Sequence, residues 1–256
     1  MEISIVGKSI IGTREDQQDS YYLCTKKHSA FAVVCDGMGG SIGGDAASQT
    51  VAEKFKQLYE AKNADEPIPS FFLRAIDILD ESIVHLQKES QETSGAGTTI
   101  VAVMIQNGGL YWLSVGDSRL YILRGSEIVQ VTRDHNFALS LENLTETESH
   151  EAMHNHDRHR PDALISFIGM GGVKIFDINE TPFHLQLDDR VLLTTDGLTK
   201  ALTDREILLY AQGKPLEAAM ESLLREATGK AAASQDNTTC VLIHISKQGG
   251  TSSGGK

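Results

Sequence analysis

An apolar run that stops abruptly at an aspartate limits the fold of this chain more than any other feature. Residues Ala30 to Cys35 form a β-type run, and Asp36-Gly37-Met38-Gly39-Gly40 follows it directly. A carboxylate at the end of a buried strand is unfavourable unless a cation or a basic group compensates its charge. The glycines allow a sharp turn and a close approach of the backbone to whatever Asp36 holds. One such pair alone would be read as a tight turn.

The same arrangement recurs three times, which makes chance turns a poor explanation. Asp117 follows the run 113–116, Asp196 follows the run 191–195, and Asp236 precedes a closing run that starts at 237. Each acid therefore stands at the end or the entry of a predicted strand. We expect the four carboxylates to serve a common purpose.

Helical and β-type patterns alternate in blocks along the chain. Helical spacing of apolar residues predicts helices near 41–58, 72–86, 204–211 and 216–228. Alternating or continuous apolar runs predict strands at 2–11, 21–25, 30–35, 98–105, 110–115, 120–123, 128–131, 183–187, 190–194 and 237–245. Asn107-Gly108 is a strong hairpin signal. Hairpin-linked strands after a helix pair indicate antiparallel sheets with helices outside them, an α+β fold.

A length of 256 residues predicts one large domain, which we place at 1–246. Within it, 136–169 is polar and histidine-rich, as expected of a surface insertion. His150 and His154 would share a helix face, so a transition-metal site is an alternative to a solvated insertion, which the interspersed acids favour. The sequence 247–256 is a Gly/Ser-rich tail, for which we predict flexibility.

Composition excludes several classes of partner. A net charge of −12 argues against nucleic acid, which would need a clustered basic face. The sequence contains neither a membrane-spanning apolar run nor a signal-peptide pattern. The three cysteines lie in apolar runs without metal-ligand spacing, which indicates a reducing environment. We therefore expect a cytoplasmic monomer.

Carboxylates without cysteine or histidine in equivalent places indicate hard cations such as Mg²⁺ and Mn²⁺. Two such ions about 3.5–4 Å apart form a clamp for phosphate-ester hydrolysis. A phosphate substrate also needs a directional cation, and Arg14 in the polar loop 12–20 is the candidate. A salt bridge from Arg14 to Glu15, Asp16 or Asp19 is the alternative, and both can hold.

These residues belong to an ordered set of motifs that resembles one family. The motifs are Gly12-x-Arg14 with Gln18-Asp19, Asp36-Gly-Met-Gly-Gly40, Gly97-Thr-Thr99, Val115-Gly-Asp-Ser-Arg119, Thr132-Arg-Asp-His135, Thr195-Asp-Gly-Leu198 and Asp236-Asn-Thr238. In this order they resemble the PPM family, the PP2C-type metal-dependent Ser/Thr phosphatases, in its bacterial single-domain form. The resemblance spans residues 7–245. It implies a β-sandwich of two antiparallel sheets flanked by helix pairs, with the metals in a cleft at one end.

The resemblance also implies a role for each site residue. Asp36 would bridge two metal ions, the Gly37 carbonyl would bind the second, and Asp196 with Asp236 would complete the first. Arg14 would bind the substrate phosphate. Supporting residues would be Asp19 (holding metal-bound water), Asp117 (a third metal site, with Asp196), Asn237, Thr98 and Thr99. The insertion 136–169 would be the family's flap beside the cleft.

The chain departs from the family pattern at three places. Gln17 stands where asparagine is usual, which can shift the Arg14 loop. Met38 stands where many eukaryotic members carry a histidine proposed as the general acid. Methionine cannot donate a proton, so metal-bound water must protonate the leaving oxygen. The segment 164–169 lacks a basic residue often found there, which bears on substrate preference.

The leading hypothesis is a protein serine/threonine phosphatase with two Mn²⁺ or Mg²⁺ ions and a third, looser metal site. The ions would activate a bridging water that attacks the phosphorus of phosphoserine or phosphothreonine. Phosphorylated proteins of a Ser/Thr kinase pathway would be its partners. Two alternatives stay open: a catalytically weak or inactive binding module with the same fold, and a phosphatase of small phosphoesters.

Overall fold

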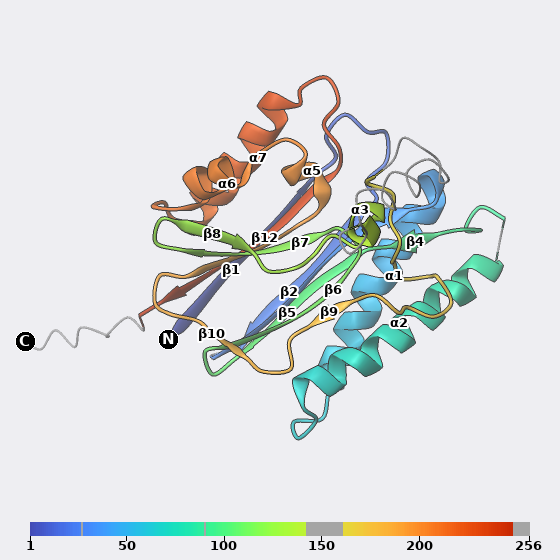
Figure 1. The fold of residues 1–256 in the computed structure, drawn as a ribbon, viewed down its shortest axis with the longest axis horizontal. Coiled ribbons are helices and arrows are strands. Elements are labelled where there is room, and N and C mark those ends of the chain that lie inside the picture. The colour runs from blue at the N-terminus through green and yellow to red at the C-terminus, as the bar shows by residue number, and fades with distance from the viewer. Residues whose placement is uncertain (27, 90, 142–160, 248–256) are drawn as a thin grey trace, which may run out of the picture.

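A computed structural model describes residues 1–26, 28–89, 91–141 and 161–247 of the chain (Figure 1). Most of the predicted flap, including its four histidines, and nearly all of the predicted tail lie outside the described residues. The described part contains two antiparallel sheets that pack face to face, with helices on both outer sides. The predicted α+β sandwich is therefore confirmed.

Both sheets are built entirely from antiparallel neighbours. The first has the order β1 (Glu2–Ile10), β12 (Thr238–Ser246), β11 (Arg190–Thr194), β7 (Arg119–Arg124) and β8 (Glu127–Gln130). The second has the order β10 (Phe183–His184), β6 (Gly109–Val115), β5 (Ile100–Gln106), β3 (Ser29–Met38) and β2 (Asp19–Lys26), with β4 (Gly97–Thr98) beside β3 and β9 (Asp177–Ile178) beside β6.

The central strands are apolar on both faces because each face is covered. In β3, Ala30, Ala32 and Val34 point into the core between the sheets, whereas Phe31, Val33 and Cys35 point toward helices. This alternation follows from the two-residue period of a strand. A strand buried on both sides therefore appears in the sequence as the continuous run 30–35 rather than as a polar–apolar alternation.

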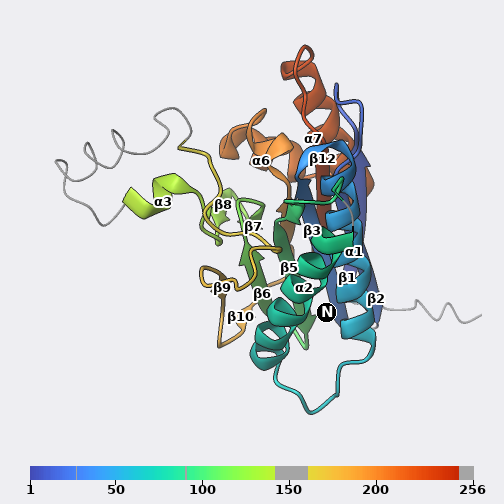
Figure 2. The same ribbon diagram turned by 90° about the vertical axis from the view of Figure 1, so that its right-hand side faces the viewer.

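Two helix pairs cover the outer faces, and Figure 2 shows the layers from the side. Helices α1 (Gly40–Glu60) and α2 (Ile68–Glu89) pack on the β3 side, where Phe31 stacks on Tyr59 at 4.4 Å between ring centroids. Helices α6 (Asp204–Ala211) and α7 (Leu216–Lys230) cover the other sheet. Thr203 and Glu206 form a reciprocal capping box at the start of α6. None of the helices in the described part of the chain could span a membrane.

The predicted elements correspond to observed ones, with corrections at the short elements. The Asn107-Gly108 pair forms the predicted turn between β5 and β6, with φ of 52° and 79°. The strand expected at 183–187 is only the two-residue β10. Strand β9 and the helix α5 (Asp196–Thr199) were not predicted, and the predicted strand 98–105 is divided into β4 and β5. Helix α3 (Phe137–Leu141) lies in the predicted insertion, for which we expect one or two short helices. Two to five residues are too few to show a period in the sequence.

A buried aspartate of α2 anchors the segment that follows the flap. Asp80 accepts hydrogen bonds from the backbone N–H groups of Gly169 and Gly172, both at 2.6 Å. Gly169 is next to Ile168, whose backbone exchanges two hydrogen bonds with Thr98 of β4. Since β4 pairs with the end of β3, Asp80 connects helix α2 to the end of the strand that carries Asp36.

Replacing Asp80 by alanine should lower the free energy of unfolding by about 2–4 kcal/mol, because two buried N–H groups lose a charged acceptor. Urea unfolding followed by circular dichroism measures this change. Asp77→Ala is the matched control, since Asp77 is exposed on the same helix. Equal stability of the two variants would show that the Asp80 hydrogen bonds do not hold the segment.

Candidate metal centre

The strand-end acids converge at one end of the sandwich. Antiparallel registers place the end of β1 beside the start of β12, and Asp19 opposite Asp36 in the β2–β3 pair. Asp196 follows β11, Asp236 precedes β12, and Asp117 follows β6. All of these carboxylates lie close enough to Asp36 for their charges to add to the rise in its pKa that burial causes. The structure thus brings together all five acids that the sequence assigned to the site.

Hydrogen bonds to its backbone fix Asp36, so its carboxylate is available to other partners. Its N–H donates to Thr99 Oγ1 at 3.0 Å, and its carbonyl accepts from Thr98 Oγ1 at 2.9 Å. Thr99 Oγ1 is also 2.7 Å from Ser118 Oγ, next to Asp117. Both threonines therefore hold the backbone of Asp36.

Two glycines allow the chain segments of the site to come close together. A Cβ atom on Gly37 would lie 2.0 Å from the Gly44 carbonyl oxygen, so a side chain cannot fit there. Gly12 has φ of +66°, and a Cβ on it would lie 2.5 Å from the Asp236 carbonyl oxygen. The Arg14 loop can therefore pack directly against the segment that carries Asp236.

Amide side chains connect this loop to the rest of the site. Asn237 accepts from the Gln18 N–H and donates to the carbonyl oxygens of Ile11 and Asp16, at 2.8–3.0 Å. Gln17 accepts from the Asp19 N–H and donates to Ser9 Oγ, both at 3.0 Å. The longer side chain at Gln17 thus bridges β1 and β2.

Two basic residues face the acids. Arg14 makes a bidentate pair with Asp236, with Nε–Oδ1 and Nη2–Oδ2 distances of 2.9 Å. The ammonium of Lys200 contacts Asp196 and lies 3.5 Å from Asp236 Oδ2. Arg14 thus pairs with an acid, but with Asp236 rather than with the loop acids considered from the sequence. A groove of about 500 Å³ runs beside it, lined also by Glu15, Gln18 and Gly40.

Burial and mutual repulsion favour the protonated acids. Burial raises the pKa of Asp19 to about 7, partly offset by hydrogen bonds from Thr195 and Thr239 and reinforced by the charges of Asp196 and Asp236. Burial likewise raises the pKa of Asp117 to about 7, with Asp196 adding to the rise. The pKa values of Asp36 and Asp196 also rise, mainly through burial. Excess negative charge in a poorly hydrated site favours a bound cation.

The side chains fit a hard divalent cation. Asp19 Oδ1 is buried without a hydrogen-bond partner, while Oδ2 accepts from Thr195 Oγ1 at 2.9 Å. The donors are carboxylates, the ligands that Mg²⁺ and Mn²⁺ prefer. Within the described part of the chain, no group of three or more acidic, histidine or cysteine side chains lies close enough together to hold a metal ion as placed. An open set of acids suits an ion that keeps several water ligands.

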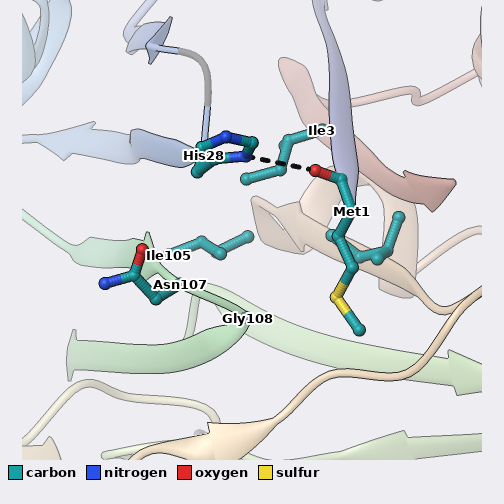
Figure 3. A pocket seen from close by; sticks show the side chains of 7 residues that line it. Met1, Ile3, His28, Ile105, Asn107 and Gly108 are labelled. Carbon is teal, nitrogen blue, oxygen red and sulfur yellow. Dashed lines mark hydrogen bonds between the residues drawn. The ribbon is translucent and has the colours of Figure 1, made fainter. Parts of the chain in front are cut away.

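A cavity at the opposite end of the sandwich lacks this chemistry. It measures about 230 Å³ and lies between the β2–β3 and β5–β6 turns and the starting end of β1 (Figure 3). Its lining includes Met1, Ile3, Ile105 and Ile245, with His28 as its one titratable side chain. Because these lining residues include no carboxylate, the cavity offers no site for a hard cation.

Two contributors to the site were not predicted from the sequence. Lys200 is four residues after Asp196, a spacing that brings side chains together on a helix, but α5 itself was not predicted. Burial lowers the pKa of Lys200, but Asp196, Asp236 and Asp36 offset this and raise it overall. Thr195 is the first residue of the motif 195–198, but the sequence assigned it no role. Its hydroxyl donates to Asp19 Oδ2 and accepts from the Thr239 N–H.

Comparison with known proteins gives one family. The family model described as protein phosphatase 2C matches residues 6–239. A serine/threonine phosphatase, stp, of Listeria welshimeri is 30% identical over 185 residues, which cover 71% of each chain.

Solved structures agree with this match. The serine/threonine phosphatase of S. agalactiae has a TM-score of 0.79 at 27% identity, covering 95% of this chain and 99% of that one. The catalytic domain of the phosphatase PstP, solved with two manganese ions, has a TM-score of 0.75 at 24% identity, covering 96% and 99%. At 24% identity, the similarity to the PstP catalytic domain shows only that the two chains share a fold.

Metal-free protein should lose stability as the pH rises from about 4 to about 7. The unfolded chain ionises Asp19 near its ordinary pKa of 3.8, whereas the folded protein holds that proton up to about 7. The folded state therefore binds more protons in this window, and ionising Asp19 costs up to about 4 kcal/mol. Asp19→Asn stays neutral and should show a shallower decline in melting temperature in EDTA. Parallel pH profiles of variant and wild type would contradict this prediction.

Proposed function

Because the chain belongs to the protein phosphatase 2C family, we propose that it removes phosphate from phosphoserine and phosphothreonine in proteins, with Mn²⁺ or Mg²⁺ as its cofactor. The observation that carries this function is the convergence of Asp36, Asp196 and Asp236 at one end of the sandwich, with Arg14 beside them. A site that has kept all three acids and the arginine favours an enzyme over an inactive binding module.

We assign the metal ligands to the acids of this cluster. Asp36 would hold both ions, the Gly37 carbonyl the second, and Asp196 with Asp236 the first. Asp19, with its unpaired buried oxygen, would hold water at the centre, and Asp117 with Asp196 would take a third ion. When bound, two such cations supply an acidified water nucleophile and neutralise charge on the phosphate.

The protein's own side chains then position the substrate. Arg14 is 59% exposed and can donate from its guanidinium to phosphate oxygens once it turns from Asp236. Thr98 and Thr99 fix Asp36 through its backbone, and Asn237 fixes the Arg14 loop. Met38 has no proton to donate, so the leaving serine or threonine oxygen must take its proton from water in the cleft.

We place the whole activity in one domain, residues 1–246, which the family match over 6–239 and the pairing of β1 with β12 support. Its partners would be phosphoproteins, the products of a Ser/Thr kinase. The three cysteines are free and two of them are buried, which is typical of a protein in a reducing cytoplasm.

The direct test is phosphate release from a phosphothreonine peptide with and without Mn²⁺, in wild type and Asp196→Asn. Turnover should require the metal and fall by about 100-fold or more in the variant, because one ligand charge is lost. Asp77→Asn, an exposed neutralisation on α2, is the control. If calorimetry shows that the wild-type protein binds Mn²⁺ but no phosphate is released, the phosphatase assignment is contradicted. If a small phosphomonoester is hydrolysed faster than phosphopeptides, the substrate class is small phosphoesters instead.

Arg14→Ala should raise KM for the phosphopeptide by about tenfold or more, because a bidentate phosphate contact is lost. Arg14→Lys should restore KM only in part, since an ammonium lacks the planar pair of donors. Steady-state kinetics at saturating Mn²⁺ gives the comparison. An unchanged KM in Arg14→Ala would remove Arg14 from phosphate binding.

A further inference from the structure

Lys200 lies in the acid cluster itself. Its ammonium contacts Asp196 Oδ2 and lies 3.5 Å from Asp236 Oδ2. Among the ion pairs of the described residues, this is the cation that reaches both acids, since Arg14 pairs with Asp236 alone. A positive charge therefore already occupies oxygens that the proposed metal site would use.

The backbone fixes the starting point of this side chain. The Lys200 N–H donates to the Asp196 carbonyl at 2.8 Å, so the two residues share one helical turn. Leu198 in the same turn is fully buried, and a Cβ on Gly197 would lie 2.1 Å from the Asn237 carbonyl oxygen. The turn is thus packed tightly against the segment of Asp236, so the Lys200 side chain starts close to both acids.

The side chain nevertheless has room to leave. It is 56% exposed, whereas the side chains of Asp196 and Asp236 are 20% and 23% exposed. A lysine has a long flexible stem and a strongly hydrated head, so it can swing into water at small cost. The cluster can therefore exchange this tethered cation for a dissolved one.

We propose that Lys200 is a built-in counter-cation that offsets part of the negative charge of Asp196 and Asp236 in the metal-free protein and competes with the divalent metal for them. This inference rests on the metal site of the proposed function. An ammonium and a divalent ion compete for the same carboxylate oxygens, because at such distances their like charges repel strongly. The lysine thus stabilises the empty cluster and weakens the binding of metal to it.

Lys200→Met tests the proposal, with Lys247→Met as the control. Both remove one positive charge and keep a similar aliphatic side chain, but Lys247 is exposed just after β12, at the other end of the sandwich. Titration calorimetry of EDTA-treated and desalted protein with MnCl₂ measures metal affinity, and thermal unfolding in EDTA measures the metal-free state.

Lys200→Met should bind Mn²⁺ about tenfold more tightly than wild type, a change of about 1.4 kcal/mol. It should also melt about 2–4 °C lower in EDTA, because the acids lose their counter-ion. Lys247→Met should resemble wild type in both measurements. Lys200→Arg keeps the charge and should keep the weaker affinity.

Unchanged Mn²⁺ affinity in Lys200→Met, with normal wild-type turnover, would overturn the counter-cation role and leave the phosphatase assignment standing. A raised KM for phosphopeptide with unchanged Mn²⁺ affinity would overturn it too, since Lys200 would then contact substrate. Wild-type protein that neither binds Mn²⁺ nor turns over substrate would overturn the proposed function, and this inference with it.

Discussion

Repulsion among carboxylates crowded at one end of the sandwich is the constraint on which the site depends. Burial and neighbouring charge raise the pKa values of Asp19, Asp36, Asp117 and Asp196. The surrounding features work against that repulsion. Backbone hydrogen bonds fix the positions of the acids, and the cations of Arg14 and Lys200 offset part of their charge. A bound divalent ion would offset the negative charge that these two side chains leave uncompensated.

The sandwich supplies the rigidity that such crowding requires. Each central strand divides its side chains between an inner core and a helix-facing core, so the strand ends next to the acids are held by packing on both sides. Asp80 extends this framework to the segment after the flap through Ile168 and Thr98. The flexible groups of the site, Arg14 and Lys200, are the half-exposed ones. The fold thus separates a fixed set of acids from movable cations.

The architecture and the acids could be predicted from the sequence because both leave local patterns. A doubly buried strand is a continuous apolar run, and an aspartate that ends it is conspicuous, as at Asp36. Lys200 left no such pattern, since its role depends on a one-turn helix and on the return of β12 beside β11. The Asp80 anchor depends on a contact 89 residues away along the chain. Contacts of this kind arise from tertiary structure alone.

The pairing order of the first sheet has a consequence for biosynthesis. Strand β12, the last of the described strands, lies between β1 and β11 and brings Asp236 and Asn237 to the site. Until β12 has left the ribosome and paired with both neighbours, the first sheet lacks an interior strand. The cluster of acids also lacks Asp236 until then. The acids are therefore brought together only at the step that inserts β12 between β1 and β11.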